Sequence, residues 1–141
     1  MIRREPFRQL LVGSWRPEGR AGGGLPATLE LWGTRPLLLP GLGRSIAVEG
    51  VLDAKGLCER LPVRGRVTFD RWTPLAAAYD LELTLGDGTP GRLHAARGRE
   101  LRGFFSAQSS VSADLVDAGG RCLAKLDLRF DYRRDLIRYL T

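Results

Sequence analysis

Apolar and polar residues alternate with a period of two along parts of this sequence, and that pattern limits the fold more than any other feature. In residues 61–69 the apolar set is Leu61, Val63, Val67 and Phe69, and the polar set between them is Arg64, Arg66 and Thr68. Residues 77–85 repeat the pattern, with Tyr79, Leu81 and Leu83 on the apolar side. A helix would scatter both sets around its axis, whereas a strand with one solvated face separates them.

Further strands are predicted where short runs containing apolar residues end at glycine or proline. The chain has 18 glycines and 8 prolines at short intervals, which is typical of many short strands joined by turns. The predicted runs are residues 27–32, 45–52, 92–97, 109–116 and 121–130. Residues 117–120 between the last two runs indicate a hairpin turn. The sequence therefore predicts seven or eight antiparallel strands.

This many antiparallel strands must hide their edges, either by closing into a barrel or by packing as two sheets. We predict a mainly β fold, an antiparallel barrel or strongly curved half-barrel in up-and-down order. A length of 141 residues fits a single domain over residues 1–141. Only the ends of the chain indicate helix, with one short turn over residues 6–12 and an amphipathic C-terminal helix over residues 132–140.

The charge pattern and the cysteines argue against several partners and locations. The net charge is +6, but acidic and basic residues mix on the same predicted faces, so no positive stripe forms for nucleic acid. Cys58 and Cys122 lack the CxxC spacing of a metal or redox site, and no apolar run follows the basic N-terminus. We therefore expect a cytoplasmic protein without a transmembrane segment, in which Cys122 is a small buried hydrophobic residue.

Catalytic and cofactor-binding patterns are scarce. The one histidine, His94, cannot complete a metal cluster, and we expect a surface imidazole beside several arginines. The carboxylates Asp80 and Glu82 fall on the predicted solvated face. No phosphate-binding loop or dinucleotide motif is present, so we expect no metal and no cofactor. Nothing in the sequence argues for an enzyme, although a small barrel isomerase or cyclase stays open.

A barrel of this size either fills its interior with side chains or holds one small ligand there. The large residues that could occupy the interior include Trp15, Trp32, Phe69 and Trp72. We predict that a hydrophobic or lipid-like ligand is lined by inward-facing side chains, with Trp15 at the closed end. The predicted lining is Trp15, Val63, Val67, Tyr79, Leu81 and Leu83.

Residues 97–105 combine arginines with two adjacent aromatic rings. Because neighbouring strand residues face opposite sides, Phe104 and Phe105 cannot both point into one interior. Together with Arg99 and Arg102 they would form a cationic loop with aromatic rings at its tip. Such a loop suits contact with an anionic membrane surface, a partner protein or the mouth of a ligand cavity.

Two residue patterns resemble those of lipocalins. Gly13-Ser14-Trp15 resembles the lipocalin G-x-W motif, and Arg129 on the last predicted strand resembles the lipocalin arginine that packs over that tryptophan. The resemblance implies a lipocalin-like barrel in which the tripeptide opens the first strand.

A broader resemblance covers residues 13–141. This part of the chain is similar to the small β-rich region that accompanies cholesterol-oxidase-like members of the glucose–methanol–choline oxidoreductases. The matching strand and turn patterns are residues 47–52, 56–57 with 61–65, 79–83 with 87–88, and 128–131. We expect the chain to differ from that family in lacking its flavin-binding domain. The resemblance therefore implies a non-catalytic accessory fold, related to lipids or sterols, without oxidase activity.

Two functions compete on this evidence. One is a barrel that binds a hydrophobic or lipid-like small molecule, which includes a sterol-like one. The other is a protein–protein interaction module with a filled barrel, whose Phe104 and Phe105 loop binds another protein. A cavity above about 300 Å³ would favour the first, and a filled core with an exposed aromatic patch would favour the second. The sequence leaves the oligomeric state open.

Overall fold

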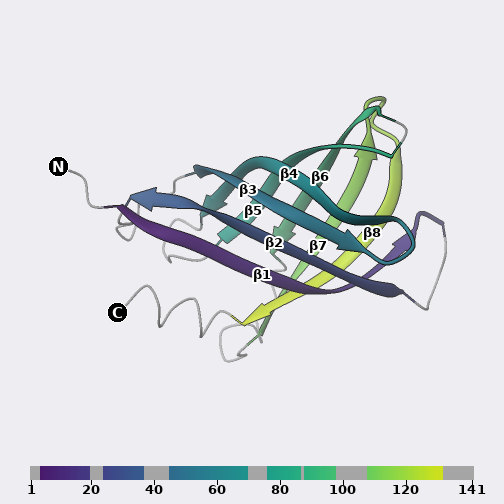
Figure 1. The fold of residues 1–141 in the computed structure, drawn as a ribbon. Coiled ribbons are helices and arrows are strands. Elements are labelled where there is room, and N and C mark those ends of the chain that lie inside the picture. The colour runs from purple at the N-terminus through teal and green to yellow at the C-terminus, as the bar shows by residue number, and fades with distance from the viewer. Residues whose placement is uncertain are drawn as a thin grey trace.

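The computed structural model of this chain describes residues 4–19, 24–36, 45–69, 76–86, 88–97 and 108–131. These residues contain eight β-strands and some of the turns between them (Figure 1). The strands are β1 (Arg4–Pro17), β2 (Leu25–Pro36), β3 (Ser45–Ala54), β4 (Cys58–Phe69), β5 (Ala76–Thr84), β6 (Pro90–Arg97), β7 (Gln108–Asp117) and β8 (Cys122–Asp131).

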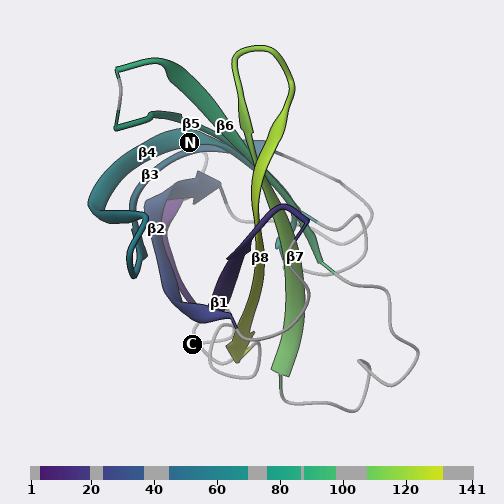
Figure 2. The same ribbon diagram turned by 90° about the vertical axis from the view of Figure 1, so that its right-hand side faces the viewer.

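The eight strands form one closed antiparallel sheet in chain order. Each strand pairs with the next, and β1 pairs with β8 from Val12 opposite Arg129 to Pro17 opposite Ala124. Figure 2 shows the strands curving round a common interior. Closure removes the exposed sheet edges that an open sheet would have to protect. The predicted up-and-down barrel is confirmed, in its closed form.

The register of the sheet determines how the strands tilt. Following cross-strand partners once round the barrel from Pro17 returns to β1 at Phe7, ten residues away. In a closed sheet such a stagger requires strands that tilt strongly to the barrel axis, by about 40°. Twisted, tilted strands give such a barrel a waisted, hyperboloid wall.

The apolar side of each strand faces the interior, and all eight strands contribute to one buried core. Its large members with less than 2% exposure are Leu11, Leu29, Leu31, Leu52, Val67, Leu81, Leu93, Val111, Leu115, Leu126 and Leu128. The alternating segment 61–69 lies in β4, and the segment 77–85 covers most of β5 and the residue after it. The apolar sets of both segments face the interior, as predicted.

The helical turn predicted over residues 6–12 is wrong, because these residues lie in the first half of β1. Gln9 is buried on the inner face, whereas Leu10 and Val12 are 55% and 50% exposed on the outer face. A polar residue inside and two apolar residues outside break the alternation, so the period of two cannot be recognised in this part of the sequence. Within the described residues this half of β1 pairs with β2 only, and proline at position 6 is tolerated on such an unpaired side.

The other predicted strands agree with β2, β3, β6, β7 and β8 to within a few residues at each end. The helix predicted over residues 132–140 and Trp72 lie outside the described residues. In the part of the chain that is described, no helix is long and apolar enough to cross a membrane.

Two glycines allow neighbouring strands to coil closely round the interior. A Cβ atom at Gly65 in β4 would lie 2.0 Å from the carbonyl oxygen of Asp80 in β5. A Cβ atom at Gly50 in β3 would lie 2.1 Å from the carbonyl oxygen of Glu30 in β2. Both contacts are with backbone, which cannot rotate away as a side chain could. Only glycine therefore fits these positions in the bent wall.

We expect Gly65→Ala to lower the free energy of unfolding by about 1–3 kcal/mol, because the added methyl group must push β4 away from β5. Gly86→Ala is the control, since nothing lies within 4 Å of a Cβ atom there. Urea unfolding followed by tryptophan fluorescence measures both values. Equal stability of the two variants would contradict the close approach of the strands at Gly65.

Candidate functional site

All six side chains that the sequence predicts for the ligand lining are inward-facing and buried. Their exposed fractions are 0% for Val67 and Leu81, 3% for Val63 and Tyr79, 6% for Leu83 and 8% for Trp15. A side chain beside a void of water size would keep accessible surface on that void. Val67 and Leu81 have none, so the middle of the lumen is filled by packed side chains.

Two side-chain contacts cross the lumen near the end where β1 begins. The Tyr79 hydroxyl on β5 donates a hydrogen bond to Gln9 Oε1 on β1 over 2.5 Å. Phe7 on β1 meets Phe69 on β4 edge to face, with ring centroids 5.5 Å apart. Because β1 is not a neighbour of β4 or β5 in the sheet, both contacts span the interior. They join opposite walls of the barrel.

Trp15 lies toward the other end of the lumen, beside the turn between β3 and β4. Its indole Nε1 donates a hydrogen bond to the carbonyl oxygen of Lys55 over 2.9 Å. The G-x-W tripeptide is near the end of β1 and does not open the strand, contrary to the lipocalin expectation. Arg129 is exposed on the outer face while Trp15 points inward, so the expected packing of this arginine over the ring is also wrong.

Leu81→Ala should lower the free energy of unfolding by about 2–5 kcal/mol, because it leaves a cavity in a filled interior. The matched control is Leu10→Ala on β1, where the side chain is 55% exposed. For the control we expect a change below about 0.5 kcal/mol. Chemical denaturation of both variants measures the difference. A small loss at Leu81 would show that the lumen around it is not packed.

The outer wall of the barrel is hollowed over β1 to β6. Three adjoining hollows of about 980, 750 and 350 Å³ lie there, and Trp32 on β2 lines all three. We call the outward-facing residues that β2 to β6 contribute to the largest of the three hollows the outer-wall groove. They are Trp32, Glu49, Val51, Pro62, Arg64, Glu82, Thr84, Pro90 and Arg92. The expectation that Trp32 fills the interior is therefore wrong, because its ring is half-buried on the outside.

Charged side chains cross the groove in a row that follows the register. Trp32, Glu49, Arg64, Glu82 and Arg92 stand side by side on β2 to β6. Arg92 forms an ion pair with Glu82 at 3.6 Å. Neither Arg64 nor Glu49 makes an ion pair or hydrogen bond with any described residue. The groove thus offers an aromatic ring beside charges that have no partner in the described chain.

His94 lies on the next row of the outer wall and is exposed there, as predicted. Its cross-strand neighbours are Asp80 on β5 and Asp114 on β7, and its Nδ1 lies 3.4 Å from Asp80 Oδ1. The direct cross-strand neighbours of the imidazole are therefore carboxylates and not the arginines expected from the sequence. Among the described residues, no group of three or more His, Cys, Asp or Glu side chains could hold a metal ion.

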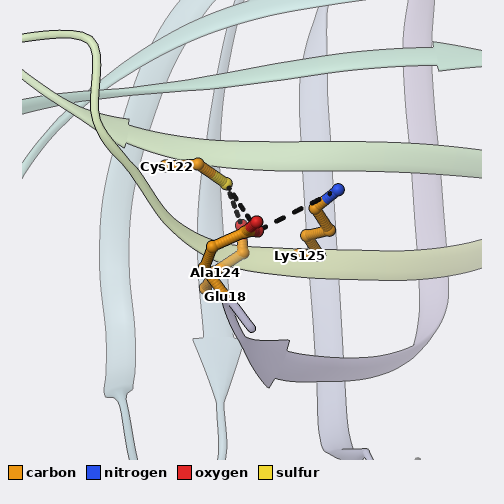
Figure 3. A network of polar contacts seen from close by, with 4 residues as sticks. All are labelled: Glu18, Cys122, Ala124 and Lys125. Atoms are coloured by element: carbon orange, nitrogen blue, oxygen red, sulfur yellow. Dashed lines mark hydrogen bonds and ion pairs between the residues drawn. The ribbon is translucent and has the colours of Figure 1, made fainter. Parts of the chain in front are cut away.

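Cys122, at the start of β8, is half-buried, which corrects the expectation of a buried hydrophobic residue. Its Sγ donates a hydrogen bond to Glu18 Oε2 over 3.3 Å, and Lys125 Nζ lies 3.9 Å from the same oxygen (Figure 3). Desolvation raises the pKa of the Cys122 thiol, and the Glu18 carboxylate raises it further. Less thiolate is therefore present at neutral pH than for a free cysteine.

Cys58, at the start of β4, is partly buried against the core. Its pKa is raised, mainly by that burial. The strand then bulges at Arg60, whose φ is 46° and whose backbone N–H donates to Asp53 Oδ1 over 2.7 Å. Because the pKa values of both cysteines are raised, neither thiol is activated as a nucleophile.

Glu18→Gln should lower the pKa of Cys122 and speed its alkylation at pH 8, because the negative charge beside the thiol is removed. Iodoacetamide labelling with peptide mass mapping gives the rate for each cysteine separately. The rate at Cys58 serves as the internal control and should not change. Unchanged or slower labelling of Cys122 would contradict the influence assigned to Glu18.

The predicted contact loop lies outside the described residues, so its contact with a partner or membrane stays a prediction. Its residues are Arg99, Arg102, Phe104 and Phe105.

The outer-wall groove is the feature that the sequence analysis missed. The sequence did contain one signal for the outward position of Trp32. Leu29 and Leu31, three residues and one residue before it, both lie on the inner face of β2. Position 32 must then face outward.

No protein-family model, curated protein or solved structure matches this chain.

Proposed function

We propose that this chain is a protein-binding module, a filled β-barrel that presents its outer-wall groove to another protein surface. The observation that carries the proposal is the contrast between a packed lumen and a hollowed wall with a half-buried tryptophan. Tryptophan and arginine are the residues most enriched at the energetic centres of protein interfaces. Trp32 and Arg64 line the same hollow.

The charges of the groove favour a protein as the partner. Arg64 and Arg92 share this hollow with the carboxylates of Glu49, Glu82 and Asp117. A surface that binds nucleic acid or an anionic membrane concentrates positive charge. Charges of both signs around apolar residues, here Trp32, Val51 and Pro62, suit a protein surface whose charges are also mixed.

A hydrophobic ligand in the lumen is the alternative, and the packing weighs against it. Val67 and Leu81 would have to move before a ligand could occupy the middle of the barrel. A ligand near the start of β1 would also have to break the hydrogen bond between Tyr79 and Gln9. An accessory role beside a larger protein, which the oxidoreductase resemblance implies, agrees with binding through the wall.

Photo-crosslinking from the groove tests the proposal. With p-benzoylphenylalanine in place of Val51, irradiation of cells that express the chain should give a discrete protein adduct. The same replacement at Ser110, which is exposed on β7 on another side of the barrel, is the matched control and should give none. Adding Trp32→Ala to the Val51 variant should remove the adduct. Adducts of equal yield from both positions, or none from the groove, would overturn the proposal.

A further inference from the structure

The charges on β3 to β6 alternate in sign across the outer-wall groove. One row holds an acidic, a basic, an acidic and a basic side chain in strand order, namely Glu49, Arg64, Glu82 and Arg92. The adjacent row repeats the central pair with Arg66 on β4 and Asp80 on β5. Consider a line that runs along the strands, midway between β4 and β5. Each charge of these two rows on one side of the line has a charge of opposite sign at the same distance on the other side.

We infer that the groove binds a second copy of this chain, related by a two-fold axis along that line. The inference rests on the proposed function and names its partner. The axis places β4 over β5 of the second copy, and β3 over β6. Arg64 then faces Glu82 of the second copy, Glu49 faces Arg92, and Arg66 faces Asp80. Each facing pair is opposite in sign and occurs twice, as in any isologous interface.

The two charges without a partner are the ones that gain most from this contact. Within the described chain, neither Arg64 nor Glu49 has an ion pair or hydrogen bond. Across the axis both face the ion pair that Glu82 and Arg92 already form at 3.6 Å. The result is one alternating network of four charges in each half of the interface. Such a network contributes more than isolated surface pairs do.

The shape of the wall permits the same arrangement. A waisted barrel curves outward round its circumference and inward along its axis, so its outer surface is a saddle. A half-turn about a line along the tilted strands places one saddle against the other, so two copies can meet along their hollows. Twisted sheets pack face to face in a similar aligned arrangement.

Apolar contacts in this interface are few. Trp32 faces Val116 of the second copy, and Val51 faces Pro90. The contact involves the outer faces of four strands, so the area buried in the interface is at the small end of the range for stable complexes. We therefore expect a dissociation constant on the order of 10–100 μM that weakens as salt screens the charges.

Charge reversal measured by sedimentation velocity tests the dimer. Over a concentration series in 50 mM NaCl, the unmodified chain should exchange between monomer and dimer. Glu49→Arg and Arg92→Glu should each weaken the dimer by about tenfold or more, because each creates facing like charges. The double variant should recover to within about threefold of the unmodified chain, because the facing pair is opposite again.

The recovery can arise only between two copies. Within one chain, β4 and β5 separate Glu49 from Arg92 by about 14 Å, which is three strand spacings. Arg129→Glu on β8, also an exposed outer-wall position, is the control and should leave the dimer unchanged. Circular dichroism of every variant establishes that the barrel is folded.

A chain that stays monomeric at every concentration, or a double variant as weak as the single ones, would overturn this inference. If the crosslink from Val51 then joins a different protein, the proposed function stands without the self-association. A crosslink of twice the chain mass supports both. The absence of any adduct, together with a monomer, would overturn both.

Discussion

The backbone pairing between β1 and β8 is the constraint on which the rest of this structure depends. It joins the two ends of an eight-stranded ribbon, and the ten-residue stagger of that join sets the tilt of every strand. Eight strands at this tilt enclose an interior that side chains of ordinary size can fill. Closure also curves the wall, and the hollows lie on its outer surface.

Most of the fold could be predicted from the sequence because the alternation is strong where the strands have one buried and one solvated face. β4 and β5 show it best, with apolar residues inside and charged residues outside. The first half of β1 could not be recognised for the opposite reason. Gln9 is buried in an apolar interior while Leu10 and Val12 are exposed, so neither face of that strand has a uniform character.

The candidate site was much less predictable. The six expected lining residues do face the interior, but the sequence cannot state whether facing side chains leave a cavity or fill it. That outcome depends on the stagger of the barrel and on contacts between distant strands, such as Tyr79 with Gln9. The row of charges from Glu49 to Arg92 likewise exists only once the register of four strands is known. The neighbours of His94 were mispredicted for the same reason.

We propose that this barrel is filled and binds through its wall. Native mass spectrometry of the freshly purified protein, followed by solvent extraction, distinguishes such a module from a ligand carrier. We expect the mass of the polypeptide, with or without its dimer, and no small molecule bound to either. A stoichiometric added mass that extraction identifies as a hydrophobic compound would contradict the filled barrel, because Val67 and Leu81 have no exposed surface in the middle of the lumen.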